Sequence, residues 1–561
     1  MDLRLLAAEP SDAEREAIDT VVGGPETNGH RVGRANRTGR HLLLPALRAA
    51  QRRVGWVSEG ALGYASRRLG VPPADAYGVA SFYALIALEE REPDVLHVCT
   101  DIVCRLAGVR AAPPGAHASP CLGLCERAPA SLRTIAGEHP REIPHPETSP
   151  PLPQAGEPGL RLLRRIAAGV DPESLDAYRS HGGYSALRRA IELGAAGVLR
   201  EVSDSRLLGR GGAAFPTGTK WEAVARQPAR PHYLVCNADE SEPGTFKDRV
   251  LIEGDPFALV EAMTIAAYAT GCEHGFVYVR AEYPIVHERL ENAFAQARTR
   301  GLLGDDVMGA GFAFDLELRI GAGAYVCGEE TALFQSIEGY RGEPRNKPPF
   351  PVEVGLFGKP TVENNVETLF NVLEVVSDSG AAYAETGTEA STGTRLFCLS
   401  GHVARPGVYE VPFGMLLSDL LDRAGARPPK AVLLGGAAGS FLRPDQLDLP
   451  LTFEDARAAG VSLGSGVVIV FDESADLVDA VLRIAEFFRD ESCGQCVPCR
   501  VGTIRQEEAL HRLAEGKTNG NELAVLADLA QVMRDASICG LGQTAMTAVE
   551  SAMMNFGVLT P

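Results

Sequence analysis

The sequence predicts a multidomain α/β protein that ends in a helical bundle. The chain has 561 residues, several times the usual size of a domain, so several separate cores are expected. Its centre alternates segments of strand and helix character, which is typical of an α/β domain with a largely parallel sheet. Its last segments show only helical periodicity.

The N-terminal part is expected to contain helices, a strand and then a linker. Residues 1–40 are polar and glycine-rich, and we expect them to form a loosely held extension. The pattern is helical from Leu42 to Glu90, and the VLHVCT segment that follows predicts a strand. Residues 139–159 hold too many prolines for a helix or an interior strand, so they predict a linker between domains.

Two further domains and a bundle follow the linker. Strands are expected at residues 232–236, 276–280 and 314–320, with helices between them. Residues 395–472 are β-rich around one helix and predict a small α+β domain. In the tail, apolar residues at helical spacing predict two helices of the closing bundle. They are Leu477, Val481, Ile484 and Phe488 on the first and Leu523, Leu526, Ala530 and Met533 on the second.

The composition excludes some classes of protein. The chain carries 73 acidic and 54 basic side chains, a formal net charge of −19, which is the wrong sign for binding nucleic acid. The N-terminus lacks a basic region followed by a long apolar run, and no window of about 18 residues is free of charge. We therefore expect a cytoplasmic protein without a signal peptide or a membrane span.

Three cysteines lie close together in the stretch ESCGQCVPCRVGT. They are Cys493, Cys496 and Cys499, and the only later cysteine is Cys539. Zinc sites usually use two separated pairs of cysteines, whereas three thiolates at gaps of two residues suit the irons of one cubane. We therefore expect a 4Fe-4S cluster, with a zinc site or a chance run of thiols as the alternatives.

A second cysteine set lies near the N-terminus. Cys99 and Cys104 are separated by four residues, and Cys121 and Cys125 by three. These wider gaps suit a flat 2Fe-2S centre with two ligands on each iron, although four such cysteines could also hold zinc. The remaining four thiols occur singly in apolar strands or beside turns, and we expect them to be inert and buried. They are Cys236, Cys272, Cys327 and Cys398.

Two glycine-rich loops and an acidic segment indicate a ligand site. The run LLGRGGAAFPTGTKW lets backbone N–H groups approach a phosphate and adds the cation of Lys220, although an ordinary turn is the alternative. Because the preceding residues look helical, we do not expect a dinucleotide fingerprint there. The run GAGAYVCGEET carries Glu329 and Glu330, which would repel phosphate and favour ribose hydroxyls or a carboxamide, or cap a helix.

Between the two loops lies CNADESEPGTFKDR, which masses polar side chains after a strand end. Ligands of α/β folds collect beyond the carboxyl ends of strands, so this segment also favours a site, with a solvated acidic turn as the alternative.

Five motifs together resemble the NADH-oxidising flavoprotein subunit of respiratory complex I and its relatives, the diaphorase subunits of NAD-linked hydrogenases and formate dehydrogenases. In chain order they are GRGGAAFPTGTKW, NADESEPGTFKDR, GAGAYVCGEET, KPPFPVEVGLFGKPT with NNVET, and ESCGQCVPCRVGT with the distant Cys539. The resemblance covers about residues 175–555. The preceding part, with GWVSEGALGYASRRLGVPPADAYGVASFYAL and the two cysteine pairs, resembles the small thioredoxin-like 2Fe-2S subunit, here fused to the flavoprotein.

The resemblance implies a division into domains. We expect an extension at 1–40, a shortened thioredoxin-like 2Fe-2S domain at 41–137, a proline-rich linker at 138–175, an FMN- and NADH-binding α/β domain at 176–390, a β-grasp-like ligand-binding domain at 391–473 and a helical bundle with the 4Fe-4S cluster at 474–561.

The resemblance also implies the contacts of the cofactors, FMN and NAD(H). The FMN contacts would be Gly209, Arg210, Gly211, Gly212, Lys220, Asn237, Asp239, Glu240, Ser241, Tyr325, Gly328, Glu329, Glu330, Asn364 and Asn365. The NADH contacts would be Phe215, Glu242, Lys347 and Phe350. The ligands of the 4Fe-4S and 2Fe-2S clusters would be the two cysteine sets given above.

The sequence departs from the family pattern at two places. Only 16 residues separate Cys104 from Cys121, about half the usual length, so one helix and one strand of the thioredoxin-like fold are expected to be missing. Glu363 stands before Asn364 where an aliphatic residue is usual. If that position contributes only its backbone, the change matters little.

The function that the resemblance implies is hydride exchange between NAD(H) and FMN, with single electrons passing through iron-sulfur clusters. No side chain would be a covalent catalyst. The sequence segments FFRDESCGQC and RDASICGLGQ are most similar to those of the β subunit of NAD-dependent formate dehydrogenases. We therefore expect a catalytic α subunit that carries further iron-sulfur clusters and the substrate metal site. A hydrogenase diaphorase, a fused subunit of complex I type and a scaffold that has lost its flavin are the alternatives.

Overall fold

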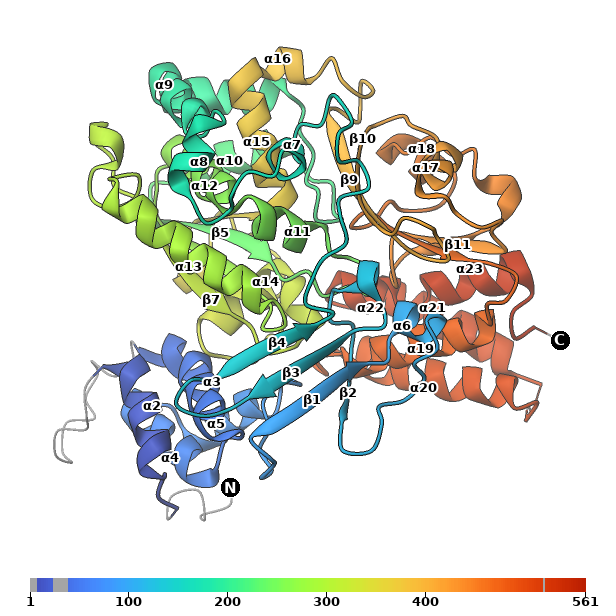
Figure 1. Cartoon of the computed structure of the whole chain (residues 1–561). Helices are drawn as coiled ribbons and strands as arrows, with labels where there is room; N and C mark the ends of the chain where they lie inside the picture. Colours follow the sequence, from blue (N-terminus) through green and yellow to red (C-terminus); the bar gives the residue numbers. More distant parts are fainter. Residues whose placement is uncertain (1–7, 24–38, 518–519, 561) are drawn as a thin grey trace.

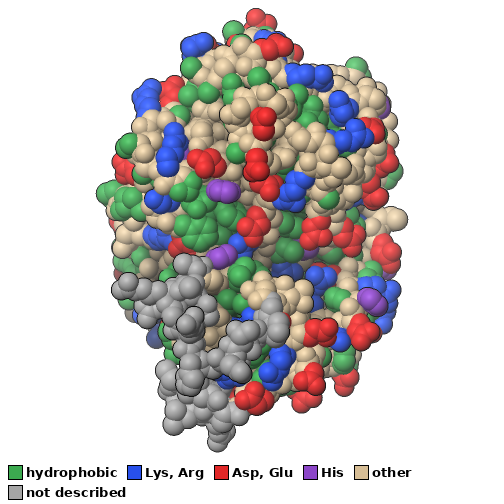
Figure 2. Space-filling model, turned by 90° about the vertical axis from the view of Figure 1, so that its left-hand side faces the viewer, with side chains coloured by type: hydrophobic (Ala, Val, Ile, Leu, Met, Phe, Trp, Pro, Cys, Tyr) green, Lys and Arg blue, Asp and Glu red, His purple; other side chains and the backbone are tan. Residues whose placement is uncertain are grey.

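The computed structural model describes residues 8–23, 39–517 and 520–560. Figure 1 shows that the N-terminal helices and their sheet lie below the central domain, and that the small β domain and the C-terminal bundle pack beside it. The face seen in Figure 2 carries acidic and basic side chains interspersed among its described residues. Within the described residues, no helix is both long enough and apolar enough to cross a bilayer.

In the described part of the N-terminal end, four α-helices are found: α2 (Asp12–Val22), α3 (Leu43–Val54), α4 (Glu59–Leu69) and α5 (Pro73–Ala80). The expectation of a loose extension was wrong for α2. Ser11 and Glu14 form a reciprocal capping box at its start, and Ile18 is fully buried. The rest of the expected extension, residues 1–7 and 24–38, lies outside the described residues.

The helical pattern expected as far as Glu90 stops ten residues earlier, because α5 ends at Ala80. The chain then turns toward the central domain. The N–H groups of Ala84 and Leu85 donate to the carbonyls of Gly323 and Ala322 at 3.1 and 3.0 Å. Tertiary hydrogen bonds thus replace those of a longer helix.

The N-terminal sheet has the strand order β2-β1-β3-β4. Its strands are β1 (Asp94–Cys99), β2 (His117–Ser119), β3 (Ser131–Ile135) and β4 (Arg141–His145). The expected strand is β1, while β4 is an edge strand within the segment expected to be linker. Between β1 and β2 the described chain has only the short helix α6 (Ile102–Leu106). The shortened connection between Cys104 and Cys121 thus still contains the end of a short helix and the strand β2.

The linker is fixed in place by the small domain. Beyond β4 it contains the short helix α7 (Arg164–Ala167). The backbone N–H groups of residues 161–163 all donate to the carboxylate of Glu410, at 3.0 to 3.1 Å. This segment is thus a strap bound across the domain boundary.

The central domain is built on a parallel sheet in the order β7-β6-β5-β8. Its strands are β5 (His232–Ala238), β6 (Cys272–Val279), β7 (Asp315–Ile320) and β8 (Thr361–Asn365). Its helices are α8 (Leu175–Ser180), α9 (Ser185–Asp204), α10 (Thr217–Ala225), α11 (Lys247–Gly254), α12 (Pro256–Thr270), α13 (Pro284–Thr299), α14 (Glu330–Ile337), α15 (Val366–Asp378) and α16 (Gly380–Tyr383). The nearly fully buried α12 contacts the sheet as well as α9, α13 and α15, as its almost wholly apolar sequence requires.

The small domain has a five-stranded sheet in the order β10-β9-β13-β11-β12. Its elements are β9 (Thr394–Gly401), β10 (Gly407–Pro412), α17 (Leu417–Ala424), β11 (Ala431–Leu434), β12 (Ser440–Leu442), α18 (Phe453–Ala458) and β13 (Val467–Phe471). One helix was expected, and α18 is a second. The only parallel pair of this sheet is β9 with β13.

The C-terminal bundle consists of α19 (Leu477–Asp490), α20 (Val497–Ala514), α21 (Glu522–Ala536), α22 (Gly540–Thr544) and α23 (Thr547–Phe556). All four apolar residues expected to face inward on α19 are buried. On α21 the same holds for Leu526, Ala530 and Met533, whereas Leu523 is 38% exposed. The bundle prediction is otherwise confirmed.

Candidate functional site

Polar side chains gather where the parallel strands of the central sheet end. β5 and β8 are neighbours, with Asn237 opposite Asn365 and Cys236 opposite Asn364. The segment that follows β7 returns to the same edge, because Asn237 Nδ2 donates to the carbonyl of Gly328 at 2.9 Å. The fold thus brings together three predicted motifs that are far apart in the sequence.

The first glycine-rich loop connects α9 to α10 and lies against the start of α15. A Cβ atom at Gly211 would be 3.1 Å from Cβ of Asn365, so the loop comes close to the end of β8. Gly212 has a φ of +121°, which side chains rarely adopt. The loop follows a helix, as expected, and therefore differs from a strand-borne dinucleotide loop.

Lys220, Glu363 and Asn237 form the polar centre of this edge. Lys220 Nζ is 3.2 Å from Oε2 of Glu363 and donates to its carbonyl oxygen at 2.9 Å. Asn237 Nδ2 donates to the other carboxylate oxygen of Glu363 at 2.8 Å. The departure at position 363 therefore adds a side chain to the site and is more than a backbone contact.

Asp239 has a buried oxygen without a partner. Its Oδ2 atom has no hydrogen bond to any described residue. Burial raises the pKa of this carboxyl well above its ordinary value. A Cβ atom at Gly328 would lie 3.4 Å from the Asp239 carbonyl oxygen, so backbone approaches closely here. A buried acceptor that needs a donor, beside closely packed glycine backbone, fits a polyhydroxyl chain such as the ribityl group of FMN.

Four expected FMN contacts use their side chains to hold the protein together. Arg210 is fully buried and donates to the carbonyls of residues 208, 392 and 394 and to a tyrosine hydroxyl. Glu240 accepts from two backbone N–H groups at the start of α11. Asn364 accepts from the Trp221 indole at 2.7 Å. Glu329 caps α14, as the capping alternative stated. We therefore expect any ligand contact at these positions to come from the backbone.

The residues expected to contact NADH lie in more open positions. Phe215 and Phe350 are 51% and 53% exposed, unusual for phenylalanine. Lys347 Nζ lies 2.8 Å from Oε1 of Glu329 and 2.5 Å from Oε1 of Glu330. Glu330 also lies 3.9 Å from Lys220, so its carboxylate sits between two lysines.

Glu242 connects the acidic segment to the small domain. Its carboxylate accepts from the N–H of Ala438 at 3.0 Å and from the hydroxyl of Ser465 at 2.8 Å. Burial raises the pKa of Glu242 to about 7, while these two donors oppose the shift. This carboxyl therefore titrates near neutral pH.

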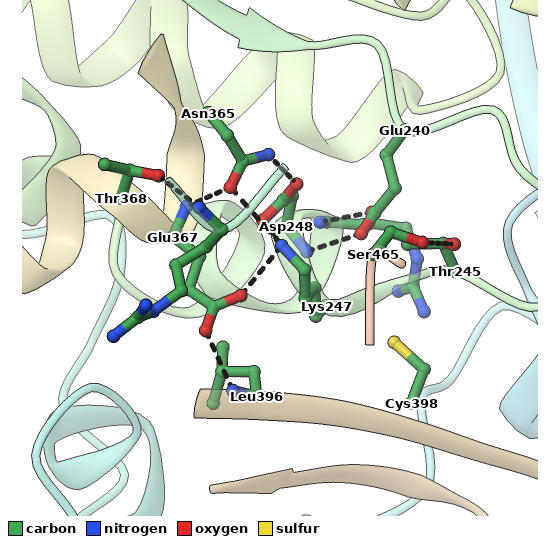
Figure 3. A network of polar contacts seen from close by, with 12 residues as sticks. Glu240, Thr245, Lys247, Asp248, Asn365, Glu367, Thr368, Leu396, Cys398 and Ser465 are labelled. Atoms are coloured by element: carbon green, nitrogen blue, oxygen red, sulfur yellow. Dashed lines mark hydrogen bonds and ion pairs between the residues drawn. The ribbon is translucent and has the colours of Figure 1, made fainter. Parts of the chain in front are cut away.

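A buried ionic network behind the site was missed by sequence reasoning (Figure 3). Lys247 Nζ lies 2.7 Å from Oδ1 of Asp248 and 2.9 Å from Oε2 of Glu367. Asp248 in turn accepts from Asn365 at 2.6 Å, and Glu367 accepts from the N–H of Leu396 in the small domain at 2.8 Å. Although burial acts to lower it, the two carboxylates raise the pKa of Lys247. The network fixes Asn365 and joins the two domains.

The four expected 4Fe-4S ligands converge. Cys493, Cys496, Cys499 and Cys539 line one cavity between α19, α20 and α22. This convergence excludes a chance run of thiols. Burial raises the pKa of Cys499 to about 12 and that of Cys539 to about 11, so thiolates here require a compensating positive charge, which metal ions supply.

One turn connects this cavity to the polar edge of the sheet. It is the 3₁₀ helix η4 (Tyr325–Gly328). Its Val326 lines the cysteine cavity, whereas the carbonyl of its Gly328 accepts from Asn237. The N–H of Tyr325 donates to Glu491 of the bundle at 2.7 Å, and its ring lies 5.0 Å from that of Phe487.

The second cysteine set also converges. Cys99, Cys104, Cys121 and Cys125 are all buried. The sulfurs of Cys121 and Cys125 are 3.4 Å apart, and contacts with Cys104 and Cys121 raise the pKa of Cys99. Four convergent sulfurs fit the donor set of a 2Fe-2S centre.

Two buried arginines bind this cysteine loop to the central domain. Arg280 donates to the carbonyls of Cys121 at 2.6 Å and Glu240 at 2.7 Å. Arg249 donates to the carbonyl of Gly123 at 3.0 Å. No spacing rule identifies such arginines, because their hydrogen-bond partners in the cysteine loop are more than one hundred residues away in the sequence. The four leftover cysteines are buried as expected, at positions 236, 272, 327 and 398.

Four family models match the chain. The Nuo51 FMN-binding domain matches residues 202–374, the NADH-ubiquinone oxidoreductase-F iron-sulfur binding region 479–558, the thioredoxin-like [2Fe-2S] ferredoxin 31–113 and the SLBB domain 396–437. The F 2 subunit of NADH-quinone oxidoreductase from Rhizobium meliloti (strain 1021) is 43% identical over 401 residues, 70% of this chain and 95% of that protein. The chain belongs to the family of F-type subunits of NADH-quinone oxidoreductase.

Two further relatives widen this F-type family. NADP-reducing hydrogenase subunit HndC of Solidesulfovibrio fructosivorans is 43% identical over 402 residues, which are 71% of this chain and 82% of that protein. The crystal structure of an NAD+-reducing [NiFe]-hydrogenase in its H2-reduced state contains a chain that superposes with a TM-score of 0.79 at 33% identity. That match covers 93% of both chains and thus includes the fused N-terminal domain.

Membership of the F-type family confirms the predicted fold class and cofactors. The chain is an NAD(H)-dependent FMN and iron-sulfur oxidoreductase subunit, with 2Fe-2S, FMN and 4Fe-4S domains following one another along the chain. The family match therefore favours iron-sulfur clusters over zinc at both cysteine sets. The match to the 2Fe-2S family model ends at residue 113, so the assignment of Cys121 and Cys125 as cluster ligands rests on the geometry described above.

Proposed function

We propose that the chain is the diaphorase subunit of an NAD-dependent formate dehydrogenase, and that it exchanges electrons between NAD(H) and a partner catalytic subunit. The observation that carries the diaphorase role is the η4 turn, which contributes to both the polar edge of the sheet and the cysteine cavity. A ligand at that edge is therefore one turn of chain away from the cluster ligands.

The chain's own residues hold the flavin in this proposal. Bound FMN exchanges a hydride with nicotinamide and single electrons with iron-sulfur clusters. The N–H groups of the 209–212 loop and the charge of Lys220 attract the phosphate. Asp239 Oδ2, which has no partner among the described residues, accepts from a ribityl hydroxyl. Neither role requires a covalent bond to the protein.

The exposed aromatic rings position the nicotinamide. Phe215 and Phe350 offer apolar faces that can stack on planar rings and exclude water from them. Lys347 supplies a cation, and Glu330 an acceptor, for the polar parts of the dinucleotide. Hydride exchange then depends on orientation, with no side chain acting as acid or base.

An apolar stripe beside the 4Fe-4S ligands marks the surface where the partner subunit docks. Val497, Val501 and Ile504 are 59%, 43% and 42% exposed and lie one helical turn apart along α20. This helix contains Cys499, so a partner docked on the stripe lies next to the cluster. Exposed apolar stripes of this kind are typical of protein interfaces.

Formate is proposed as the partner's substrate because the sequence segments around Cys493 and Cys539 are most similar to those of formate dehydrogenase β subunits. Hydrogen is the second candidate, since the full-length match to the [NiFe]-hydrogenase chain includes the fused N-terminal domain. Both candidates require a separate chain that carries the substrate metal site.

The test is to isolate the tagged full chain with its natural partners under anaerobic conditions. We expect a complex that reduces NAD with formate and does not do so with hydrogen. Reduction with hydrogen alone would transfer the assignment to the hydrogenase class. A complex that contains no flavin would overturn the diaphorase role itself.

A further inference from the structure

A cavity of about 40 Å³ lies between the N-terminal domain and the central domain, and none of the proposed cluster or cofactor ligands lines it. It is bordered by α3, the N-terminal sheet, the segment after α5 and the residues that follow β6 and β7, and it is partly open to solvent. Its polar lining consists of Arg48, Gln51, Arg52, Arg91, His97, Thr134 and Glu142. Three arginines thus line a small cavity at a domain boundary.

The positive charges of this cavity exceed the negative ones. Arg52 Nε lies 3.4 Å from Glu142, the only carboxylate among the lining residues. Arg91 donates to the carbonyl of Gly55 at 2.8 Å, which leaves its charge without a carboxylate. Arg48 makes no hydrogen bond or ion pair with any residue that the structure describes. Two guanidinium charges are therefore uncompensated.

A second carboxylate that acts on Arg48 does not balance its charge. Glu282 acts on Arg48 through space, but it forms its own ion pair with Arg280 at 2.6 Å.

The Arg48 side chain is half-buried and lines the cavity, and its partial burial lowers its pKa. Guanidinium groups that share one partly enclosed cavity repel one another unless an anion or solvent offsets their charge. A guanidinium fork matches the oxygens of an oxyanion in a bidentate arrangement.

We infer that this cavity binds one small oxyanion with two negative charges, of the phosphate or sulfate type. Two uncompensated guanidinium groups match a dianion. The volume of about 40 Å³ accommodates roughly three water molecules at about 10 to 15 Å³ each, which is the space of a tetrahedral oxyanion and too little for a nucleotide.

The bound anion would strengthen the contact between the two domains. Ala281 and Ala322 of the central domain form one side of the cavity, and α3 with the N-terminal sheet forms the other. Ala281 follows Arg280, which holds the Cys121 loop against the Glu240 loop. An anion here stabilises the placement of the 2Fe-2S domain on the flavin domain.

The test is calorimetric titration of the full chain loaded with FMN, so that the flavin phosphate already occupies its own site. Inorganic phosphate and sulfate are added in a chloride buffer of matched ionic strength. We expect saturable binding of one ion per chain and a melting temperature that rises with phosphate concentration. Heats and melting temperatures that follow ionic strength alone would overturn the inference.

Variants assign the binding to the cavity. Arg48→Gln is expected to lower phosphate affinity at least tenfold, and Arg48→Lys, which keeps the charge without the fork, to lower it less. Arg53→Gln is the matched control, because Arg53 lies on the same helix but pairs with Glu138 at 3.5 Å and does not line the cavity. Unchanged phosphate affinity in Arg48→Gln, or competition by AMP, would place the ion elsewhere and overturn the inference.

Discussion

Replacing Glu363 by glutamine is expected to tighten FMN binding. Glutamine keeps the oxygen that accepts from Asn237 but removes the negative charge beside Lys220. In the protein without flavin, the carboxylate of Glu363 competes with the FMN phosphate for Lys220. Removing the negative charge of Glu363 also reduces its repulsion of the FMN phosphate, wherever between the two glycine-rich loops the phosphate binds.

The expected magnitude follows from the geometry. At the 3.2 Å between Lys220 Nζ and Glu363 Oε2, two unit charges interact by about 5 kcal/mol at an effective dielectric constant of about 20. Desolvation of the pair offsets much of this. A net gain of about 1 to 2 kcal/mol corresponds to roughly five- to thirtyfold tighter FMN binding.

The assay is fluorescence titration of FMN into flavin-free protein. Glu389→Gln is the matched control, because Glu389 is exposed and the substitution removes the same charge. Lys220→Met should weaken FMN binding, and the double variant should show that the two effects are coupled. Unchanged or weaker FMN binding in Glu363→Gln would refute this account of position 363.

Three further predictions concern the clusters and the pH dependence. Cys539→Ser should lower the iron content by about four per chain and keep the FMN and the 2Fe-2S signal. The control Cys272→Ser should leave the iron content, the FMN and the 2Fe-2S signal unchanged. Loss of both clusters in Cys539→Ser would contradict the ligand sets. Arg280→Gln should lower the reduction potential of the 2Fe-2S centre in an EPR titration, because it removes a buried positive charge beside Cys121, and Arg280→Lys should lower it less; an unchanged potential would contradict this role. The pKa of Glu242 is raised to about 7, so the folded state binds more protons than the unfolded state and the free energy of unfolding falls as pH rises from about 5 to 8. Glu242→Gln should remove about 1 to 3 kcal/mol of this fall in urea unfolding, and an equal pH dependence in both proteins would contradict the assignment.

Much of the site was predictable because its motifs are local in sequence. Cys493, Cys496 and Cys499 are close neighbours, and their spacing alone favours an iron-sulfur cluster. The helical start of α14 and the helix before the first glycine-rich loop also follow from local patterns. Where hydrogen bonds are made between neighbours, the sequence contains the necessary information.

The missed features depend on contacts between distant residues. Lys247 is an unremarkable basic residue in the sequence, and its role appears only when Asp248 and Glu367 surround it. Arg210 was expected to face FMN, but the fold directs its guanidinium to backbone carbonyls near residue 392. The helical pattern expected to reach Glu90 ends early because the N–H groups of Ala84 and Leu85 donate to carbonyls of the loop after β7. The Ser11 capping box was a local signal that could have been found.

The central claim is that electrons pass between NADH, a flavin and the cluster of Cys493, Cys496, Cys499 and Cys539. Its most direct test is EPR spectroscopy of the purified full chain after anaerobic addition of NADH. The account predicts loss of the flavin absorbance, the EPR signals of one 4Fe-4S and one 2Fe-2S centre, and about six irons per chain. A colourless protein that contains zinc, or a flavin that NADH reduces without any 4Fe-4S signal, would contradict it.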